Sequence, residues 1–593
     1  MDAKQLFREP FLLLREGFRR SVSNGTFMNL FFSSFLKRSL FLCFALLLFV
    51  PLLGCPHSVP TSLPENVQAK PAFFREVSQS SGLNYKWTIP GSRPLHILQT
   101  IGNGCAFLDY DRDGNLDILL VGQKTALYKG DGKGHFTDVS EAMGLSKLSG
   151  HFLGCAIGDV DNDGFDDIYL SGYRTGLLLK NKEGKRFDDI TAASGLKPQP
   201  WGTSCAFLET TPGSRRLDLI VLNYCNFDPK VNQLLCDEHG VKTSCGPRHY
   251  IPIKAVFYQN LGGGRFKDIS KQAGMTGVNG RGLGVAVIDE NGKGQLSIAI
   301  ANDETPGDLL RQIGKANSPQ FRNDGAASGT ATDRDGNMHG GMGMDWGDYD
   351  NDGKFDLFVA TYYGEFKSLY QSEGGGSYHD FALPAGIGDT AKNYVTFGSK
   401  WLDYDNDGKL DLALANGHVE DNIAEVSPGQ MYREKSLLFH NKGGLPVTFE
   451  EVSEKAGADF SRPIVGRGLA VGDYDNDGRL DLLVVDSEGA PLLLHNEVTD
   501  SGHWIGFRLE GGQGNRNGYG ATITAETESG KQIRLCGTDG SYLSASDARV
   551  HFGLGKNTKV TRLTIQWLGG KTQTVENLEG DRYYTIQEGQ APR

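Results

Sequence analysis

The chemistry of this chain is concentrated in a short acidic pattern, which reads DYDRDGNLD from Asp109 to Asp117. Carboxylates stand at positions one, three, five and nine, and they repel one another unless a cation neutralises them. Their spacing lets them converge on one point, the glycine at position six permits a sharp turn, and position seven can offer its carbonyl oxygen. This is an oxygen shell of the kind that Ca²⁺ prefers, and the first seven positions match an EF-hand loop.

A single copy of this pattern could be either a metal-binding loop or a solvated acidic turn, and repetition in the same register favours the metal-binding loop. The pattern returns in the same register from Asp159, Asp348, Asp403 and Asp473. We therefore predict about five structural Ca²⁺ sites. Their candidate ligands, position seven contributing its carbonyl, are Asp109, Asp111, Asp113, Asn115, Asp117, Asp159, Asp161, Asp163, Phe165, Asp167, Asp348, Asp350, Asp352, Lys354, Asp356, Asp403, Asp405, Asp407, Lys409, Asp411, Asp473, Asp475, Asp477, Arg479 and Asp481.

Two further copies of the pattern have lost essential acids. The stretch from Glu209 lacks carboxylates at positions three and five, and the one from Asp289 places Lys293 at position five. An ammonium group there argues against a metal ion. We expect both turns to keep the fold without binding a cation.

The acidic loops belong to a longer repeat of short strands. Each loop follows a strand of small residues, such as GNGCAFLDYD, and leads into an apolar strand, often followed by LxxN and a glycine turn. A second phrase recurs between loops, as in FREVSQSSGL from Phe74 and FTDVSEAMGL from Phe136. Units of about four strands must stack to bury their faces, and radial stacking leaves few exposed edges. Seven loops predict an all-β fold with a seven-bladed β-propeller at residues 73–497, closed by pairing of its terminal strands.

These motifs resemble known families. The repeats look like the FG-GAP/VCBS repeats of integrin α-subunit propellers and bacterial surface proteins. The stretch GMGMDWGDYDNDGKFDLFVATY, with ANGHVEDN and YREKSLLFHN, is similar to the cartilage-acidic-protein family, and GNRNGYGATITAETESGK with LTIQWLGGKTQTVENL resembles an ASPIC/UnbV domain. The resemblance covers roughly residues 73–590 and departs at the two degenerate loops. The alternation of apolar and polar residues predicts a small all-β, sandwich-like domain at residues 498–593.

The N-terminus carries the pattern of an export signal. Lys37 and Arg38 precede an apolar run from Leu40 to Leu53, which is shorter than the ~20 residues of a membrane-spanning helix. The following LLGC resembles a bacterial lipoprotein cleavage box and makes Cys55 the expected lipidated residue. The alternative is an ordinary signal peptide with an incidental cysteine. We interpret 1–54 as the signal region, with Met28 as the possible true start, and 55–72 as a flexible tether.

The remaining cysteines suggest one disulfide. Cys236 and Cys245 lie in a long insertion and can pair in an oxidising compartment, with Cys225 as a rival partner. Three others each precede a loop by four residues. We interpret these as small buried residues of inner strands rather than as a metal site; they are Cys105, Cys155 and Cys205.

Charge and motifs limit the function. The formal net charge is −12, and five Ca²⁺ ions would bring it to −2. Because no basic stripe is present, nucleic acid is not an expected partner. We expect an exported protein, lipid-anchored in the bacterial cell envelope, that binds a glycan or protein ligand as an adhesion or scaffold module. The alternative is a carbohydrate-active enzyme, such as a calcium-dependent polysaccharide lyase using the propeller cleft.

No sequence motif identifies catalytic residues. Histidines and arginines near the inner strands could form an acid–base pocket in a central cleft or could make local hydrogen bonds, and we favour the latter. They are His151, His339, His418, Arg281 and Arg467.

Overall fold

The computed structural model describes residues 72–314, 318–512 and 514–593. All of them belong to one compact unit, Lys70–Arg593. The predicted signal region, the lipidation site Cys55 and nearly all of the tether lie outside the described residues. Within the described part, no helix combines the length and the apolar character that a membrane crossing requires.

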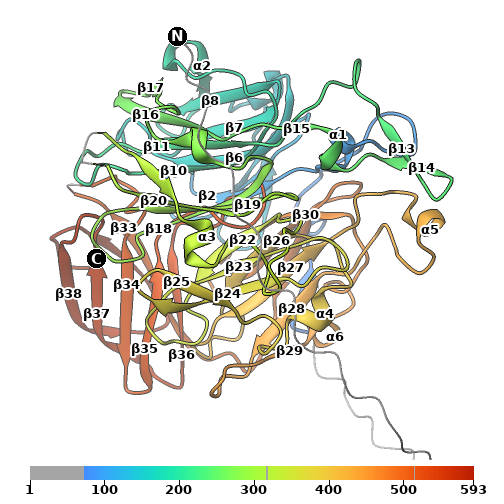
Figure 1. Cartoon of the computed structure of the whole chain (residues 1–593). Coiled ribbons are helices and arrows are strands. Elements are labelled where there is room, and N and C mark those ends of the chain that lie inside the picture. Colours follow the sequence, from blue (N-terminus) through green and yellow to red (C-terminus); the bar gives the residue numbers. More distant parts are fainter. Residues whose placement is uncertain (1–71, 315–317, 513) are drawn as a thin grey trace, which may run out of the picture. The chain divides into compact units, whose positions relative to one another are not determined.

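Seven four-stranded antiparallel sheets fill the chain between Phe74 and Asn496 (Figure 1). We call them blades 1 to 7, in the order of their first strands. Blades 1 to 3 comprise β2 (Cys105–Leu108), β3 (Asp117–Leu120), β4 (Ala126–Gly130) and β5 (Phe136–Asp138); β6 (His151–Gly158), β7 (Asp167–Tyr173), β8 (Thr175–Asn181) and β9 (Phe187–Asp189); and β10 (Gly202–Leu208), β11 (Asp218–Asn223), β16 (Val256–Gly262) and β17 (Arg265–Asp268).

The remaining blades repeat the same strand order. Blades 4 to 7 comprise β18 (Gly282–Ile288), β19 (Ser297–Asn302), β20 (Asp308–Gln312) and β21 (Phe321–Asn323); β22 (Met344–Gly347), β23 (Asp356–Val359), β24 (Ser368–Gly374) and β25 (Ser377–Asp380); β26 (Thr396–Leu402), β27 (Asp411–Asn416), β28 (Leu437–Asn441) and β29 (Phe449–Glu451); and β30 (Gly466–Gly472), β31 (Asp481–Asp486), β32 (Leu492–Asn496) and β1 (Phe74–Glu76).

The blades contact one another in cyclic order, as in a β-propeller. The first strand of each blade contacts the first strand of the next, and β30 of blade 7 contacts β2 of blade 1. Each pair of neighbouring blades shares a cluster of buried apolar side chains, so that both faces of every sheet are covered. Strand β1 completes blade 7 by pairing with β32, with Phe74 opposite Asn496.

The recurring phrase that begins with phenylalanine or tyrosine forms the outermost strand of each blade. Its aromatic residue is buried, as at Phe136 and Phe187, and packs against the preceding blade of the ring. The copy FRNDGAASG from Phe321 was not recognised from the sequence, because its valine–serine pair is replaced by aspartate and glycine. The short helices, several of which directly follow these strands, are α1 (Ile97–Thr100), α2 (Thr191–Ser194), α3 (Gly325–Ser328), α4 (Gly388–Ala391), α5 (Ile423–Val426) and α6 (Ser453–Ala456), with 3-10 turns at Leu145–Lys147, Pro247–His249 and Met275–Gly277.

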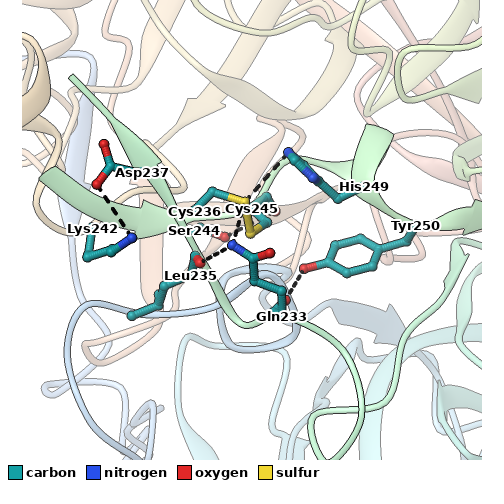
Figure 2. The surroundings of a disulfide bond; sticks show 9 residues. All are labelled: Gln233, Leu235, Cys236, Asp237, Lys242, Ser244, Cys245, His249 and Tyr250. Carbon is teal, nitrogen blue, oxygen red and sulfur yellow. Dashed lines mark hydrogen bonds and ion pairs between the residues drawn. A yellow bond between two sulfur atoms is a disulfide. The ribbon is translucent and has the colours of Figure 1, made fainter. Parts of the chain in front are cut away.

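The insertion of blade 3 forms two small hairpins. Strands β12 (Cys225–Asn226) and β15 (Ile251–Pro252) pair, as do β13 (Leu235–Glu238) and β14 (Val241–Ser244). A disulfide joins Cys236 of β13 to Cys245, and the His249 ring lies beside it (Figure 2). Cys225, the rival partner, is buried with a free thiol.

The C-terminal segment, residues 498–593, contributes two sheets (red strands in Figure 1). One contains β33, β36 and β39, with β33 and β39 parallel, and the other contains β34, β35, β37 and β38. Side chains from both sheets share one core with blades 2 and 3. Their bounds are β33 (His503–Glu510), β34 (Thr522–Thr527), β35 (Gly530–Leu535), β36 (Val550–Gly555), β37 (Lys559–Gln566), β38 (Thr572–Glu579) and β39 (Tyr583–Gln587).

Residues 539–547, between β35 and β36, occupy the centre of the ring of blades. We call this stretch the plug. It forms hydrogen bonds with the first strand of six blades through Cys105, Cys155, Ser204, Val285, Met344 and Val471 among others. It reaches the seventh through Lys400 of β26, whose ammonium donates to the carbonyl of Asp539 over 2.8 Å. The stretch belongs by sequence to the domain predicted to follow the propeller, whereas its hydrogen bonds join it to the first strands of the blades.

Candidate functional site

The five acidic loops share one backbone conformation. Each joins the first strand of a blade to the second, and position nine is the first residue of that second strand. Positions four and six adopt positive φ angles, as Arg112 (61°) and Gly114 (89°) do in the first loop. This conformation is costly for most residues but accessible to glycine and asparagine. Position four is asparagine in the other four loops, at Asn162, Asn351, Asn406 and Asn476.

Within each loop the acids converge as the spacing predicts. Ligand atoms lie within 4.8 Å of one another in seven sets among the described residues. Five of these sets include one in each loop, and three of the five consist of positions one, three and nine. The other two combine positions three and five with a histidine. These five sets are Asp109, Asp111 and Asp117; Asp159, Asp161 and Asp167; Asp348, Asp350 and Asp356; Asp405, Asp407 and His440; and Asp475, Asp477 and His495.

Hydrogen bonds hold the first and last acids in place. The position-one carboxylate accepts the N–H of the position-six glycine, as Asp159 does from Gly164 over 2.8 Å. The position-nine carboxylate ties two strands together: Asp167 accepts the N–H groups of Val160 (3.0 Å) and Asn181 (2.8 Å). These bonds fix the acids before any ligand arrives, so the loops are preorganised.

Positions five and seven interact with each other. The N–H of position seven donates to the position-five carboxylate, as from Asn115 to Asp113 over 2.9 Å. In the last three loops the side chain of position seven also pairs with that carboxylate, through Lys354, Lys409 and Arg479. The position-five acids are therefore partly neutralised by the protein itself.

Several carboxylate oxygens in the loops are buried without a hydrogen-bond donor. Burying a polar atom without a hydrogen-bond partner costs free energy, and the cost is largest for a charged carboxylate. These atoms are Oδ1 of Asp109, Asp111, Asp161 and Asp475 and Oδ2 of Asp356. A divalent cation between them would satisfy these oxygens, so the residues present fit such an ion.

The electrostatics of the buried acids agree with this fit. Burial, reinforced by neighbouring carboxylates, raises the pKa of Asp117 to about 8 and that of Asp356 to about 9. The same causes raise the pKa of Asp481 to about 8. A cation bound between the acids would favour their charged forms and remove this penalty.

A side chain from the third strand of the blade also faces each loop, and it was not among the residues predicted from the sequence. Lys129 pairs with Asp111 and lies 3.1 Å from Asp113. His440 lies at the corresponding place in blade 6, with Nδ1 3.2 Å from Asp411 and 3.7 Å from Asp405. The sequence carried a signal for these residues, because they occupy the same place in the repeat, the third position of the recurring LxxN phrase or its equivalent.

The asparagine of that phrase links neighbouring blades. Asn181 donates its Nδ2 to the carbonyl of Tyr110 in the loop of blade 1 over 2.8 Å, and Asn441 makes the same bond to Tyr349. Asn496 repeats it to Tyr404 over 2.7 Å. These three acidic loops are therefore fixed partly by the following blade.

The two degenerate loops keep the turn without the acid set. Asp289 still accepts the N–H groups of Lys293 (3.2 Å) and Gly294 (2.6 Å). Glu209 accepts hydrogen bonds from both the backbone and the side chain of Asn515 in the C-terminal segment. Its carboxylate thus serves docking in place of a cation site.

The C-terminal segment also forms hydrogen bonds with four of the five acidic loops. Arg508 donates to Asp109 over 2.6 Å, and Tyr583 donates to Asp473 over 2.6 Å. Asn517 accepts the N–H of Asp159 over 2.9 Å, and Gly555 donates its N–H to the carbonyl of Asn406. The candidate metal loops therefore form part of the docking surface for this segment.

The histidines and arginines considered as pocket residues are largely enclosed. Arg467 is fully buried, donates to the carbonyls of Thr100, Gly417, Gly466 and His418, and stacks on a phenylalanine ring. His339 and Arg281 are buried, whereas His151 is half-buried. Burial lowers the pKa of His418 to about 3, with the Arg467 charge contributing. The four buried groups, Arg281, His339, His418 and Arg467, make local hydrogen bonds. The plug occupies the axis of the ring, where a central cleft would lie.

Two families match parts of the chain. Residues 511–593 match the family described as ASPIC and UnbV. Residues 101–170, 348–414 and 403–484 match the FG-GAP-like repeat. The FG-GAP-like matches include all five acidic loops.

Curated relatives are named cartilage acidic protein 1. The protein from Mus musculus is 25% identical over 397 residues, which cover 65% of this chain and 54% of the relative. The protein from Xenopus tropicalis is 25% identical over 352 residues, which cover 51% of this chain and 53% of the relative. The chain therefore spans about half the length of the curated relatives it matches.

Solved structures with similar backbones include two lectins. The Agrocybe aegerita lectin, described as recognising non-reducing terminal N-acetylglucosamine, gives a TM-score of 0.37 at 14% identity, covering 67% of this chain and 94% of that chain. The BP39L lectin from Burkholderia pseudomallei gives 0.40 at 9%, covering 67% and 97%. These scores are too low to support an inference about ligands. The chain therefore contains segments that match the FG-GAP-like repeat and a C-terminal segment that matches the ASPIC and UnbV family, and it is similar to cartilage acidic protein 1 over about half of that protein's length.

Proposed function

We propose that this protein is a binding or adhesion module of the bacterial cell envelope, stabilised by Ca²⁺ and anchored through a lipid on Cys55. FG-GAP-like repeats support the binding role, with a glycan or a protein as the ligand. The convergence of carboxylates in five loops, with buried oxygens that lack donors, carries the proposal for calcium. The three sets formed by positions one, three and nine contain carboxylate oxygens only and suit Ca²⁺, and extracellular Ca²⁺ fills even weak sites.

Calcium in this proposal is structural. The loops lie between strands and under the C-terminal segment, so an ion there joins elements that are distant in sequence. An ion that binds only the folded form stabilises it by about 2.7 kcal/mol at a concentration one hundred times its Kd. Filling several loops would therefore supply a large part of the stability.

The test uses the soluble fragment that begins at residue 56. Adding EGTA should lower its melting temperature strongly, and Ca²⁺ but not an equal concentration of Mg²⁺ should restore it. Asp113→Ala, which removes one ligand of one loop, should cause a much smaller loss, and Asp500→Ala, an exposed acid outside the loops, should cause none. An unchanged melt in EGTA would reject structural calcium.

The anchor requires a separate test in the full chain. Cys55→Ala should move the protein from the membrane fraction to the soluble fraction and abolish labelling by a fatty-acid analogue. Cys225→Ala, which changes a buried cysteine of blade 3, should leave both properties intact. Retention of the Cys55→Ala protein in the membrane fraction would contradict lipid anchoring.

A further inference from the structure

An open cavity of about 550 Å³ lies where the C-terminal segment meets the loops of blades 1 and 3. Four arginines line it: Arg112 from the first acidic loop, Arg215 from the degenerate loop of blade 3, and Arg516 and Arg593 from the C-terminal segment. Glu510 is the one acidic side chain in the lining. The cavity thus concentrates positive charge in a chain whose formal net charge is −12.

The single carboxylate is already used. Glu510 Oε1 accepts a hydrogen bond from Arg112 Nη2 over 2.8 Å, and Oε2 accepts one from Arg593 Nη2 over 2.5 Å. Among the described residues, neither Arg215 nor Arg516 forms an ion pair with an acid. Two guanidinium groups of the cavity therefore remain without a counter-charge.

Arg516 carries a second indication. Its Nε is buried and has no hydrogen-bond acceptor among the described residues. Arg516 also lies near Arg112, because both side chains approach Gly164. A Cβ atom placed on Gly164 would be 2.9 Å from Arg112 Nη1 and 3.3 Å from Arg516 Nε. Two like charges that approach one point are unfavourable unless an anion is shared between them.

The acids of the first loop do not supply that anion. In the loop beside the cavity, Asp109 is paired with Arg508, and Asp111 and Asp113 are paired with Lys129. Cations bound in the acidic loops would add positive charge nearby and would not balance the arginines. Asp166 of the second loop lines the adjoining pocket together with Arg112 and Arg516, but its carboxylate already accepts a hydrogen bond from Asn517. An anion from outside the described chain would supply further negative charge.

We propose that this arginine cavity binds the oxyanion of an acidic saccharide, a carboxylate or a sulfate. Guanidinium groups form paired hydrogen bonds with such planar or multi-oxygen anions. The volume lies within the range of small-molecule sites, about 300 to 1,000 Å³. No aromatic side chain lines the cavity, so a nucleobase would find no stacking surface, whereas Gln587 and the backbone of Gly511 and Gly512 can bond sugar hydroxyls.

This inference rests on the proposed binding function and names its ligand class. The test measures binding of the fragment from residue 56, with Ca²⁺ present, to a uronic-acid oligosaccharide, a sulfated oligosaccharide, a neutral oligosaccharide of equal length and AMP. Calorimetry should detect one of the two acidic sugars but neither the neutral sugar nor AMP. Affinity should fall as salt rises, because the contact is ionic.

Variants then locate the site. Arg516→Ala and Arg215→Ala, on separate segments, should each weaken binding by about tenfold or more, as expected for a hydrogen bond to a charged group. Arg562→Ala is the matched control, because this arginine is exposed on the C-terminal sheet and pairs with Glu576. Each variant must keep the wild-type melting temperature, and Arg215→Ala decides the matter if Arg516→Ala does not fold.

Two results would overturn the inference. If the wild type binds an acidic sugar but both arginine variants bind it equally well, the ligand lies elsewhere and the proposed binding function survives. If the wild type binds neither acidic sugar, or binds AMP as tightly, the assignment of an acidic saccharide fails. Failure of the chelator test would leave the cavity proposal unaffected, so the two are separable.

Discussion

Replacing Tyr542 tests whether the plug is an integral part of the ring. Tyr542 is fully buried, its hydroxyl donates to the carbonyl of Ile101 over 2.8 Å, and its ring lies 4.9 Å from that of Phe397. These partners belong to the propeller repeats, whereas Tyr542 lies in the C-terminal segment. A change at Tyr542 should therefore weaken the blades themselves.

The magnitude follows from the contacts that are lost. Truncating a buried aromatic side chain to alanine costs about 3 to 5 kcal/mol. Leaving the Ile101 carbonyl unsatisfied adds about 1 kcal/mol or more. We expect Tyr542→Ala to lower the free energy of unfolding by about 5 kcal/mol, and Tyr542→Phe, the matched control that keeps the ring, by only about 1 kcal/mol.

The assay combines urea denaturation with hydrogen exchange read by mass spectrometry, both in saturating Ca²⁺. Peptides from blades 1 and 6 should lose protection together with those from the C-terminal sheets in Tyr542→Ala. The reasoning is refuted if the variant loses less than about 1 kcal/mol. It is also refuted if only C-terminal peptides lose protection, because the blades would then be stable without the plug.

Three further predictions concern other parts of the chain. Burial lowers the pKa of His418 to about 3, below its unfolded value near 6.5, so protonation favours the unfolded state. The free energy of unfolding should therefore fall by about 2 kcal/mol between pH 8 and pH 5. In urea titrations His418→Gln should lose about 2 kcal/mol less over this range than the wild type, and equal pH profiles would contradict the prediction. A Cβ on Gly553 would lie 2.2 Å from Asp403 Oδ2, so Gly553→Ala should weaken calcium at that loop and lower the measured stoichiometry by one, whereas an unchanged stoichiometry would show that the loop adapts. The disulfide between Cys236 and Cys245 spans nine residues, so replacing both by serine should cost at most about 2.5 kcal/mol; exchange should rise in β13 and β14 alone, and increased exchange throughout the ring would refute a local role.

The sequence alone determined the features that depend on short-range spacing. Positions one to nine of each acidic loop converge because a turn with two left-handed residues brings neighbouring side chains together, and that geometry is written in nine residues. The four-stranded unit was equally visible, because its turns and alternating strands repeat. The copy at Phe321 shows the limit, since one changed phrase concealed an outer strand.

Only the tertiary structure decided what the C-terminal segment does. Arg508 meets Asp109 across 399 positions of sequence, and Tyr542 meets the Ile101 carbonyl across 441. Neither contact has a local signature, because polar groups at that separation are brought together by the closing of the ring and the burial of its centre. The spacing of residues within a loop determines the shape of that loop, whereas the tertiary fold determines which segments cover it. The plug and the arginine cavity therefore form only when segments distant in sequence pack together.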